Sequence, residues 1–236
     1  MASRTEIPSS GSAGKSPVEA TLSPAGSKDS IWSYRSKFKR AFDVFFSIAA
    51  LPVALPFGLL IALTIRLDSE GPVLIRVRRL GRGGSTFYKF KFRTMIPDAE
   101  AVLRNLLNSH PEIRDEYQRT YKIKNDPRIT RFGKWLRKTS LDELPQILNV
   151  IKGEMSWVGP RDILDTELAM YGECASKLLS VQPGITGQWQ VSGRSKLSYE
   201  QRVLLDSFYI DNMSLLRDLE IIVKTVPVVL FGDGAV

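Results

Sequence analysis

The feature that most constrains this chain is residues 44–65, a stretch of 22 residues without a charged side chain. An α-helix needs about 20 apolar residues to cross the hydrocarbon core of a bilayer, so this stretch is long enough to enter a membrane. Pro52 and Pro56 fall in its middle. Each proline removes a backbone donor and clashes with the preceding helical turn. The sequence therefore predicts a membrane helix with a sharp bend.

Basic residues flank this stretch at both ends: Arg35, Lys37, Lys39 and Arg40 before it, and Arg66, Arg76, Arg78, Arg79 and Arg82 after it. Lysine and arginine next to a membrane segment favour the cytoplasmic side, and here they favour it at both ends. This symmetry indicates a re-entrant helix that enters and leaves on one face, held by an associated domain that satisfies the broken backbone. A kinked helix that crosses the bilayer once is the alternative.

The chain divides by composition into three parts. Residues 1–30 are rich in Ser, Gly and Pro and have almost no large apolar side chains, so we expect a disordered tail. Residues 31–67 combine an aromatic and basic segment suited to a membrane interface with the membrane helix. Residues 68–236 have the mixed composition of one compact domain.

Charge and residue usage limit the chemistry. The formal net charge of +8 favours an anionic partner, which could be nucleic acid, anionic lipid or a phosphorylated substrate. Cys174 and His110 are the one cysteine and the one histidine of the sequence. A disulfide framework, a Cys/His zinc site and a histidine-based catalytic pair are therefore not expected on a single chain. Carboxylates, basic groups and a hard cation remain.

Hydrophobic periodicity and turn residues predict the elements of the domain. They are a β-hairpin at residues 73–78 and 87–92, helices at 98–107 and 112–121, a buried helix through Leu144, Ile147, Leu148 and Ile151, and an amphipathic helix at 214–229. The fold class is α/β of the α+β type: a compact, helix-rich domain with a short β-hairpin and an N-terminal re-entrant membrane helix.

Two adjacent carboxylates, Asp142 and Glu143, form the most informative pattern. Ser140 and Glu143 also have the spacing of a capping box, which would make this pair structural. Pro145 argues against that alternative, because it would fall where a helix capped by Ser140 already needs a backbone donor. A carboxylate at a helix N-terminus stays ionised, which suits a nucleophile or a metal ligand.

Several basic residues could bind anions, although a solvated face is the ordinary place for any one of them. Arg161 follows a Gly-Pro turn that fixes its direction, as a phosphate-binding fork requires. Arg194 ends a turn-rich run, and residues 88–95 alternate basic and aromatic side chains. Anion sites, paired carboxylates and a membrane helix together indicate phosphoryl-group transfer at an interface. Mg²⁺ would neutralise phosphate charge there, with Asp or Glu as nucleophile.

The order of motifs resembles the bacterial sugar transferase family, the monotopic phosphoglycosyl transferases. The resemblance covers residues 36–232 and is greatest to the short galactose phosphotransferases that use undecaprenyl phosphate in exopolysaccharide synthesis. The motifs that carry it are Lys39-Arg40 with Asp43, Lys91 to Met95, Asn125 to Arg128, Ser140 to Gln146, Gly153 to Arg161, Pro183 to Gly187, Gly187 to Gln190, Tyr171-Gly172 and Asn212 to Leu216.

The resemblance implies a role for each matching residue. Asp142 would attack the β-phosphate of a UDP-sugar, expel UMP, carry the sugar phosphate to undecaprenyl phosphate and help to hold Mg²⁺. Glu143 would act as a base or position the metal. The candidates for substrate contacts are Lys91, Arg93, Arg137, Arg161 and Arg194. The partners would be UDP-sugar, undecaprenyl phosphate and membrane lipid at the cytoplasmic face of the bacterial inner membrane. No nucleic acid is expected, and homo-oligomerisation stays open.

The sequence departs from the family pattern at two places. Leu55-Pro56, with an additional Pro52, replaces the usual Ser-Pro at the break of the membrane helix. Asp162 follows Arg161 where the family usually has proline, which predicts a different loop geometry there. Galactose is the expected sugar and glucose the alternative. A glycosyltransferase that releases UDP, and a non-enzymatic, membrane-tethered binder of anionic lipid or nucleic acid, are the rival functions.

Overall fold

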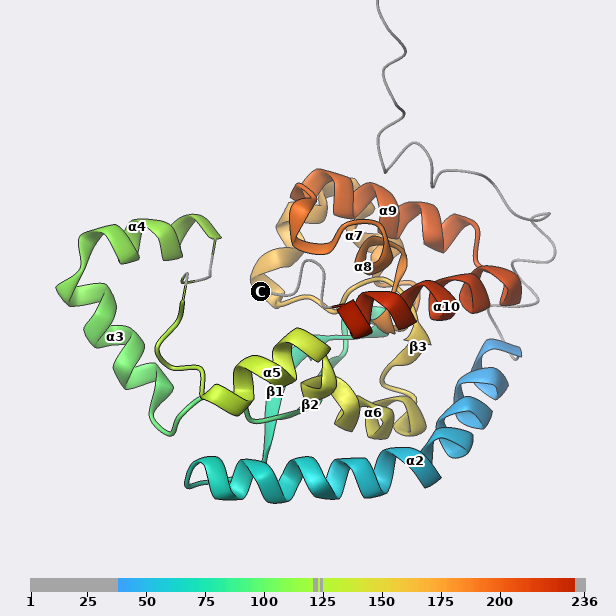
Figure 1. The fold of residues 1–236 in the computed structure, drawn as a ribbon. Coiled ribbons are helices and arrows are strands. Elements are labelled where there is room, and N and C mark those ends of the chain that lie inside the picture. Colours follow the sequence, from blue (N-terminus) through green and yellow to red (C-terminus); the bar gives the residue numbers. More distant parts are fainter. Residues whose placement is uncertain (1–37, 121–122, 124, 232–236) are drawn as a thin grey trace, which may run out of the picture.

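The computed structural model describes residues 38–120, 123 and 125–231. The predicted tail, residues 1–30, lies outside the described residues, as does most of the interfacial segment that follows it. A long helix, α2 (Lys39–Asp68), runs beneath the rest of the described chain, and the other helices and two small sheets form a domain above it (Figure 1).

Helix α2 passes through Pro52 and Pro56 and is visibly bent between a steep N-terminal part and a longer straight part (Figure 1). This confirms the predicted bend. Among the described residues, α2 alone is long and apolar enough to cross a membrane. Many of its large apolar side chains are exposed: Phe45, Ile48, Val53, Leu55, Phe57, Leu59, Leu60, Leu63 and Leu67. Apolar surface on this scale marks a contact with lipid or another apolar partner.

The N-terminal end of α2 is tied to the domain by polar contacts. The Arg40 guanidinium donates to the carbonyl oxygen of Ile151 at 2.7 Å. The buried carboxylate of Asp43 accepts from Ser156 Oγ at 2.9 Å and from the backbone N–H of Trp157 at 3.0 Å. A buried carboxylate needs such donors, so this end of α2 is fixed in position against the domain.

The C-terminal end of α2 is held by the same domain. Ile61 and Ile65 are buried and pack in one cluster with Phe92. The Arg93 guanidinium donates to the carbonyl oxygen of Ser69, just past the helix, at 2.7 Å. Both ends of a helix about 45 Å long therefore contact one domain.

The predicted hairpin is present. Strands β1 (Leu74–Leu80) and β2 (Thr86–Phe92) pair antiparallel, and η2 (Arg82–Gly84) forms the turn between them. Gly83 has a φ of 70°, which a residue without Cβ adopts readily. Successive side chains of a strand point to opposite faces, so Lys89 and Lys91 share the face of β2 that points into the domain.

After the hairpin, α3 (Ala99–Ser109) and α4 (Pro111–Thr120) form a pair that projects from the domain (Figure 1). Both were predicted, and α4 begins at its proline, where the missing N–H costs nothing. The chain then returns through α5 (Arg131–Thr139), η3 (Leu141–Gln146) and α6 (Ile147–Lys152). The predicted buried helix is wrong in part, because the α-helix begins only at Ile147 and Leu148 is exposed.

A second sheet was not predicted. Strands β3 (Ser156–Val158) and β4 (Gly184–Thr186) pair in parallel, and η4 (Asp165–Cys174) and α7 (Ala175–Leu178) lie in the connection between them. A Cβ on Gly184 would lie 2.1 Å from the backbone nitrogen of Gly159, so this close approach requires glycine.

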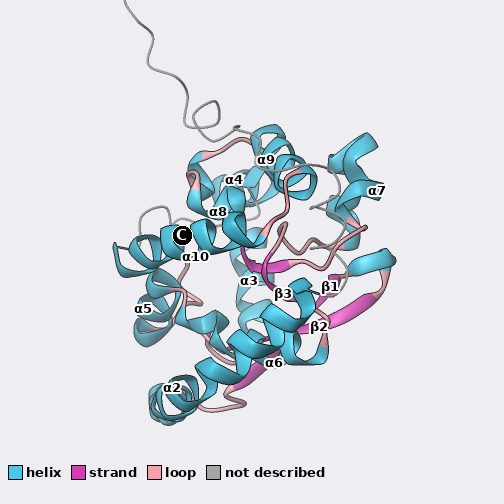
Figure 2. Ribbon diagram, turned by 90° about the vertical axis from the view of Figure 1, so that its right-hand side faces the viewer, coloured by secondary structure: helices cyan, strands magenta, loops and turns pink. Residues whose placement is uncertain are grey.

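The C-terminal helices cover these short strands. They are α8 (Gln188–Val191), the single turn η5 (Arg194–Lys196), α9 (Tyr199–Asp211) and α10 (Leu215–Phe231), the last being the predicted amphipathic helix. Figure 2 shows α8, α9 and α10 on one side of β3, with α6 and α2 on the other. Val158, Tyr209, Ile210 and Ile221 form the core between β3, α9 and α10.

Candidate active site

The two adjacent carboxylates lie in the first turn of η3. Helix α5 ends at Thr139, and Ser140 reverses the chain with a φ of 56°. Ser140 does not cap the following turn. Its Oγ instead accepts from Arg194 Nη2 at 3.0 Å. The capping-box alternative for Asp142 and Glu143 is therefore wrong, and the sharp turn at Ser140 presents both carboxylates to strand β2.

Lys91 of β2 bridges the two carboxylates. Its Nζ lies 3.0 Å from Asp142 Oδ2 and 2.8 Å from Glu143 Oε1. Burial raises the pKa of Asp142, although Lys91 opposes this shift. Burial would also raise the pKa of Glu143, but the charges of Lys91 and Lys89 outweigh it and leave that pKa below its usual value. The environment thus gives two neighbouring carboxyl groups different proton affinities, as catalytic pairs require.

A second ion pair lies behind this dyad. Both carboxylate oxygens of Asp162 contact Lys89 Nζ, at 2.7 and 2.6 Å, and Arg79 Nε reaches Asp162 Oδ2 at 2.6 Å. Burial would raise the pKa of Asp162, but Lys89 and Arg79 hold it well below its usual range. Asp162, the departure from the family pattern, is therefore an ionised partner of β1 and β2.

Arg93 follows the last residue of β2, and Arg137 lies on α5. Arg137 Nε donates to Thr94 Oγ1 at 2.9 Å, and its charge opposes the rise that burial causes in the pKa of Asp142. Arg137 is therefore close enough to the dyad to act on its charge. Arg93 donates to the backbone at the end of α2, so its guanidinium connects β2 with the membrane helix. Its role as a substrate contact stays a prediction.

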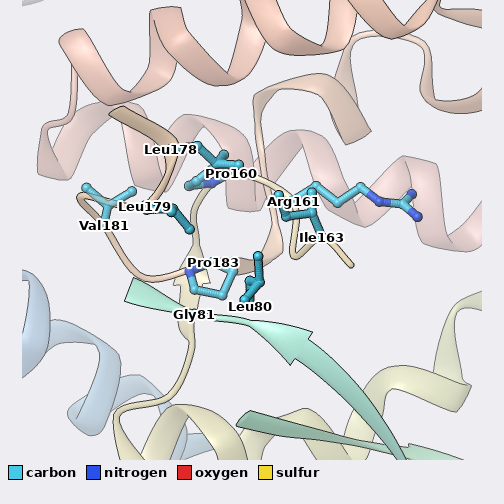
Figure 3. Close-up of a pocket in the computed structure, with 9 residues that line it drawn as sticks. All are labelled: Leu80, Gly81, Pro160, Arg161, Ile163, Leu178, Leu179, Val181 and Pro183. Carbon is cyan, nitrogen blue, oxygen red and sulfur yellow. The ribbon is translucent and has the colours of Figure 1, made fainter. Parts of the chain in front are cut away.

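Arg161 follows the Gly159-Pro160 turn. Figure 3 shows its side chain extending away from the small apolar pocket that its backbone helps to line. The Arg161 Cζ lies 5.4 Å from the centroid of the Trp189 ring, and Arg202 Cζ lies 5.0 Å from the same ring. Two guanidinium groups on one indole form a basic surface of the kind that binds phosphate.

Below this surface lies a buried carboxyl group, Asp206. Tyr171 Oη donates to its Oδ2 at 3.0 Å. Burial raises the pKa of Asp206 to about 7, against the lowering effect of Tyr171 and Arg161. Arg202 and Asp206 were missed from the sequence, because both lie on α9, where a charged residue is ordinarily a solvated one. The packing of α9 against α8 and η4 brings them to Arg161.

Arg194 comes close to the dyad from a distant part of the chain. It begins η5 with a φ of 53° and donates to Ser140 Oγ. A cavity of about 240 Å³ lies beside this contact, and Ser140, Glu143 and Arg194 are among the residues that line it. The structure thus brings Lys91, Arg137 and Arg194 to the Asp142–Glu143 dyad, while Arg93 and Arg161 have their own partners.

The dyad was also predicted to hold Mg²⁺. Within residues 38–120, 123 and 125–231, no cluster of three or more His, Cys, Asp and Glu side chains could hold a metal ion by itself. Mg²⁺ commonly binds through one or two carboxylates together with substrate phosphates and water. Lys91 contacts one oxygen of each carboxylate, so the second oxygens of Asp142 and Glu143 suit this mode.

A carboxylate dyad with surrounding basic groups, next to an exposed apolar helix, defines a membrane-associated enzyme that handles phosphorylated substrates. Comparison with known proteins gives the particular family. The chain belongs to the bacterial sugar transferase family, whose model matches residues 34–232.

Three relatives show the extent of the similarity. The exopolysaccharide production protein ExoY of Sinorhizobium fredii is 45% identical over 197 residues, which are 84% of this chain and 87% of that protein. An undecaprenyl-phosphate galactose phosphotransferase of Salmonella typhimurium is 46% identical over 84% of this chain, but the match spans 41% of that protein. A UDP-galactose-lipid carrier transferase of Erwinia amylovora is 44% identical, over 86% of this chain and 42% of that protein. The chain thus spans less than half the length of the last two relatives.

Proposed function

We propose that this chain transfers galactose 1-phosphate from UDP-galactose to undecaprenyl phosphate, releasing UMP, as the first step in assembling an exopolysaccharide repeat unit. Glucose 1-phosphate is the alternative group. The single observation that carries the proposal is Lys91 bridging Asp142 and Glu143, which assembles a charged dyad on a domain held against an apolar helix. The names of two relatives favour galactose and undecaprenyl phosphate.

In the first half-reaction, a carboxylate oxygen of Asp142 attacks the β-phosphorus of the UDP-sugar. The bond from this phosphorus to the bridging oxygen breaks, and UMP leaves with that oxygen and its electron pair. The product on the enzyme is an acyl phosphate that carries the sugar. Lys91 and Arg137 orient and stabilise the ionised nucleophile, and the Arg161 surface is a candidate for the nucleotide phosphates.

In the second half-reaction, a phosphate oxygen of undecaprenyl phosphate attacks the same phosphorus. The bond between phosphorus and Asp142 oxygen breaks, which restores the carboxylate and gives a lipid-linked sugar diphosphate. Glu143, whose pKa lies below its usual value, stays ionised and can accept a proton from the acceptor phosphate or help to hold the cation. Mg²⁺, when bound at the dyad, would neutralise phosphate charge.

The proposed place of action is the cytoplasmic face of the bacterial inner membrane, with α2 as a re-entrant helix. The contacts of Arg40 and Asp43 at one end, and of Ile61 and Arg93 at the other, support this path. A helix that crossed the bilayer would need to separate these two ends. Basic residues on both sides of residues 44–65 support the same path.

The test uses the full chain in lipid nanodiscs with Mg²⁺, undecaprenyl phosphate and a panel of UDP-sugars. We expect UMP and a lipid-linked sugar diphosphate, with UDP-galactose giving the largest kcat/KM. Release of UDP would indicate a glycosyltransferase that moves the sugar alone. No nucleotide release with any UDP-sugar, together with binding to anionic vesicles, would indicate a non-enzymatic tethered binder.

A further inference from the structure

The cavity beside the dyad has one polar end and an apolar remainder. Its polar end is formed by Glu143, Ser140 and Arg194. The walls that extend from this end are mostly apolar and come from η3, α6, β3 and the last turns of α10: Leu144, Ile147, Trp157, Val228 and Val229. Such a division fits an elongated ligand with a charged head and a hydrocarbon body.

Two threonines of the wall are already paired, whereas the buried Gln190 Oε1 accepts no hydrogen bond from the described residues. Thr186 Oγ1 and Thr225 Oγ1 lie 2.8 Å apart, and Thr225 also donates to the carbonyl oxygen of Ile221 at 2.7 Å. Thr186 is therefore the donor between the two hydroxyl groups, and both threonines are satisfied without a ligand. A ligand with many polar groups would find few free partners along these walls and would leave most of its donors and acceptors unpaired, which costs binding free energy.

The cavity also adjoins the membrane helix. Leu141 and Leu144 line it, and the same two leucines pack against the Ile61 and Ile65 cluster at the C-terminal end of α2. On the other wall, α10 continues with exposed apolar residues, including Val223 and Val226. The apolar end of the cavity thus lies between two elements that expose hydrocarbon surface, whereas its polar end lies at the dyad.

Size restricts the occupant further. Pockets that enclose a whole small-molecule ligand measure ~300–1,000 Å³. A cavity of about 240 Å³ is smaller than this range, so a larger ligand would occupy it only in part, as the end of a long chain that continues into lipid would do.

We propose that this cavity is the acceptor subsite, which takes the phosphate and the first isoprene units of a polyprenyl phosphate. The phosphate lies at Arg194 and Ser140, next to Glu143, and the isoprene units contact Ile147 and Val228. This inference rests on the proposed function and extends it, because it gives the lipid acceptor its own binding site. It places the acceptor phosphate beside the residue that follows Asp142, as attack on the phosphorus of an aspartyl sugar phosphate requires.

The two half-reactions separate the roles of the two substrates. Val228→Trp should fill the apolar part of the cavity. Overfilling of a packed site is unfavourable, so we expect the KM for undecaprenyl phosphate to rise roughly tenfold or more. The stoichiometric release of UMP from UDP-galactose without acceptor, and the KM for UDP-galactose, should stay as in the unmodified chain. Val228→Ser, which keeps the space but makes the wall polar, should raise the acceptor KM less.

Val226→Trp is the matched control, since Val226 lies two residues away on α10, is 55% exposed and does not line the cavity. It should leave all three quantities unchanged. An unchanged acceptor KM in both Val228 variants would overturn the proposal, as would a rise confined to the KM for UDP-galactose. Failure of the proposed function gives a different result, because the unmodified chain would then release no UMP at all.

Discussion

Lys89 and Asp162 form a buried ion pair directly behind the dyad, with Lys89 Nζ at 2.7 and 2.6 Å from the two carboxylate oxygens. Lys91 lies two residues along the same strand face and bridges Asp142 and Glu143. Asp162 therefore pairs with Lys89, and Lys91 is the lysine that contacts the dyad. Positive and negative side chains alternate from one ion pair to the next, so each buried charge lies next to a charge of opposite sign.

The first prediction concerns this pair. Asp162→Asn removes the charge opposite Lys89, and loss of one partner of a buried ion pair costs about 3–5 kcal/mol of folding free energy. The double variant Lys89→Gln with Asp162→Asn removes both charges, so it should be destabilised by less than the sum of the two single changes. Thermal unfolding midpoints of the three variants in nanodiscs measure this coupling. Additive losses would mean that the two side chains contribute independently.

The dyad itself could be predicted from the sequence, whereas much of its surroundings could not. The pairing of Asp142 with Glu143 is local, and so are the hairpin turn and the helical periodicity of residues 214–229. Strands β3 and β4 have three residues each, too few to show an alternating pattern, and they meet only because Gly159 and Gly184 allow close approach.

The polar contacts that fix the site are also long-range. Asp43 reaches Ser156 across 113 positions of the chain, and Lys89 reaches Asp162 across 73. No local pattern identifies such partners. Asp162 was singled out only as a departure from the family pattern, and the pairing that explains it depends on how β2 packs against the loop after β3.

The second prediction assigns the nucleophile. Asp142→Asn should lower kcat by at least roughly 10³-fold, because an amide cannot form the acyl phosphate. The variant should stay folded, because Lys91 keeps its ion pair with Glu143. Incubating the unmodified chain with UDP-galactose alone should add the mass of a hexose phosphate to the peptide that contains Asp142. Glu143→Gln is the comparison, and its peptide should still gain this mass. Retention of most activity in Asp142→Asn would remove Asp142 from this role.

The third prediction concerns Arg161. A lysine at this position keeps the charge but cannot form a planar, bidentate contact with phosphate or stack on Trp189 in the same way. Arg161→Lys should therefore lower kcat/KM for UDP-galactose by roughly tenfold or more. Arg78→Lys is the control, because Arg78 is an exposed arginine whose carboxylate partner, Asp165, is also exposed. Equal kinetics in the two variants would place Arg161 among the solvated residues.

The fourth prediction is a dependence of stability on pH. Burial raises the pKa of Asp206 from 3.8 to about 7, so the folded state binds a proton more tightly than the unfolded state does. Between pH 4 and 7 the contribution of Asp206 to stability should fall as pH rises, and above pH 7 it should become constant. Asp206→Asn cannot titrate.

The difference in unfolding midpoint between Asp206→Asn and the unmodified chain isolates this group. The unfolding midpoint of Asp206→Asn should rise relative to that of the unmodified chain as the pH is raised from 5 to 8. Asp211→Asn, an exposed change on the same helix, is the control and should show a smaller trend. A constant difference across this range would mean that Asp206 does not titrate there.

The last prediction concerns the path of α2. Pro52 and Pro56 bend the helix, and both of its ends contact one domain, so we expect Asp68 and Ser30 to face the cytoplasm together; Ser30 lies outside the described residues. Single cysteines at these positions, in a Cys174→Ser background, should resist a membrane-impermeant thiol reagent in intact spheroplasts and react after lysis. Reaction of either cysteine before lysis would rule out the re-entrant path. Pro52→Ala with Pro56→Ala should straighten α2 and pull one end from its contacts. Ser30→Cys should then react from outside, and activity should fall, because the dyad would lose its fixed position at the membrane.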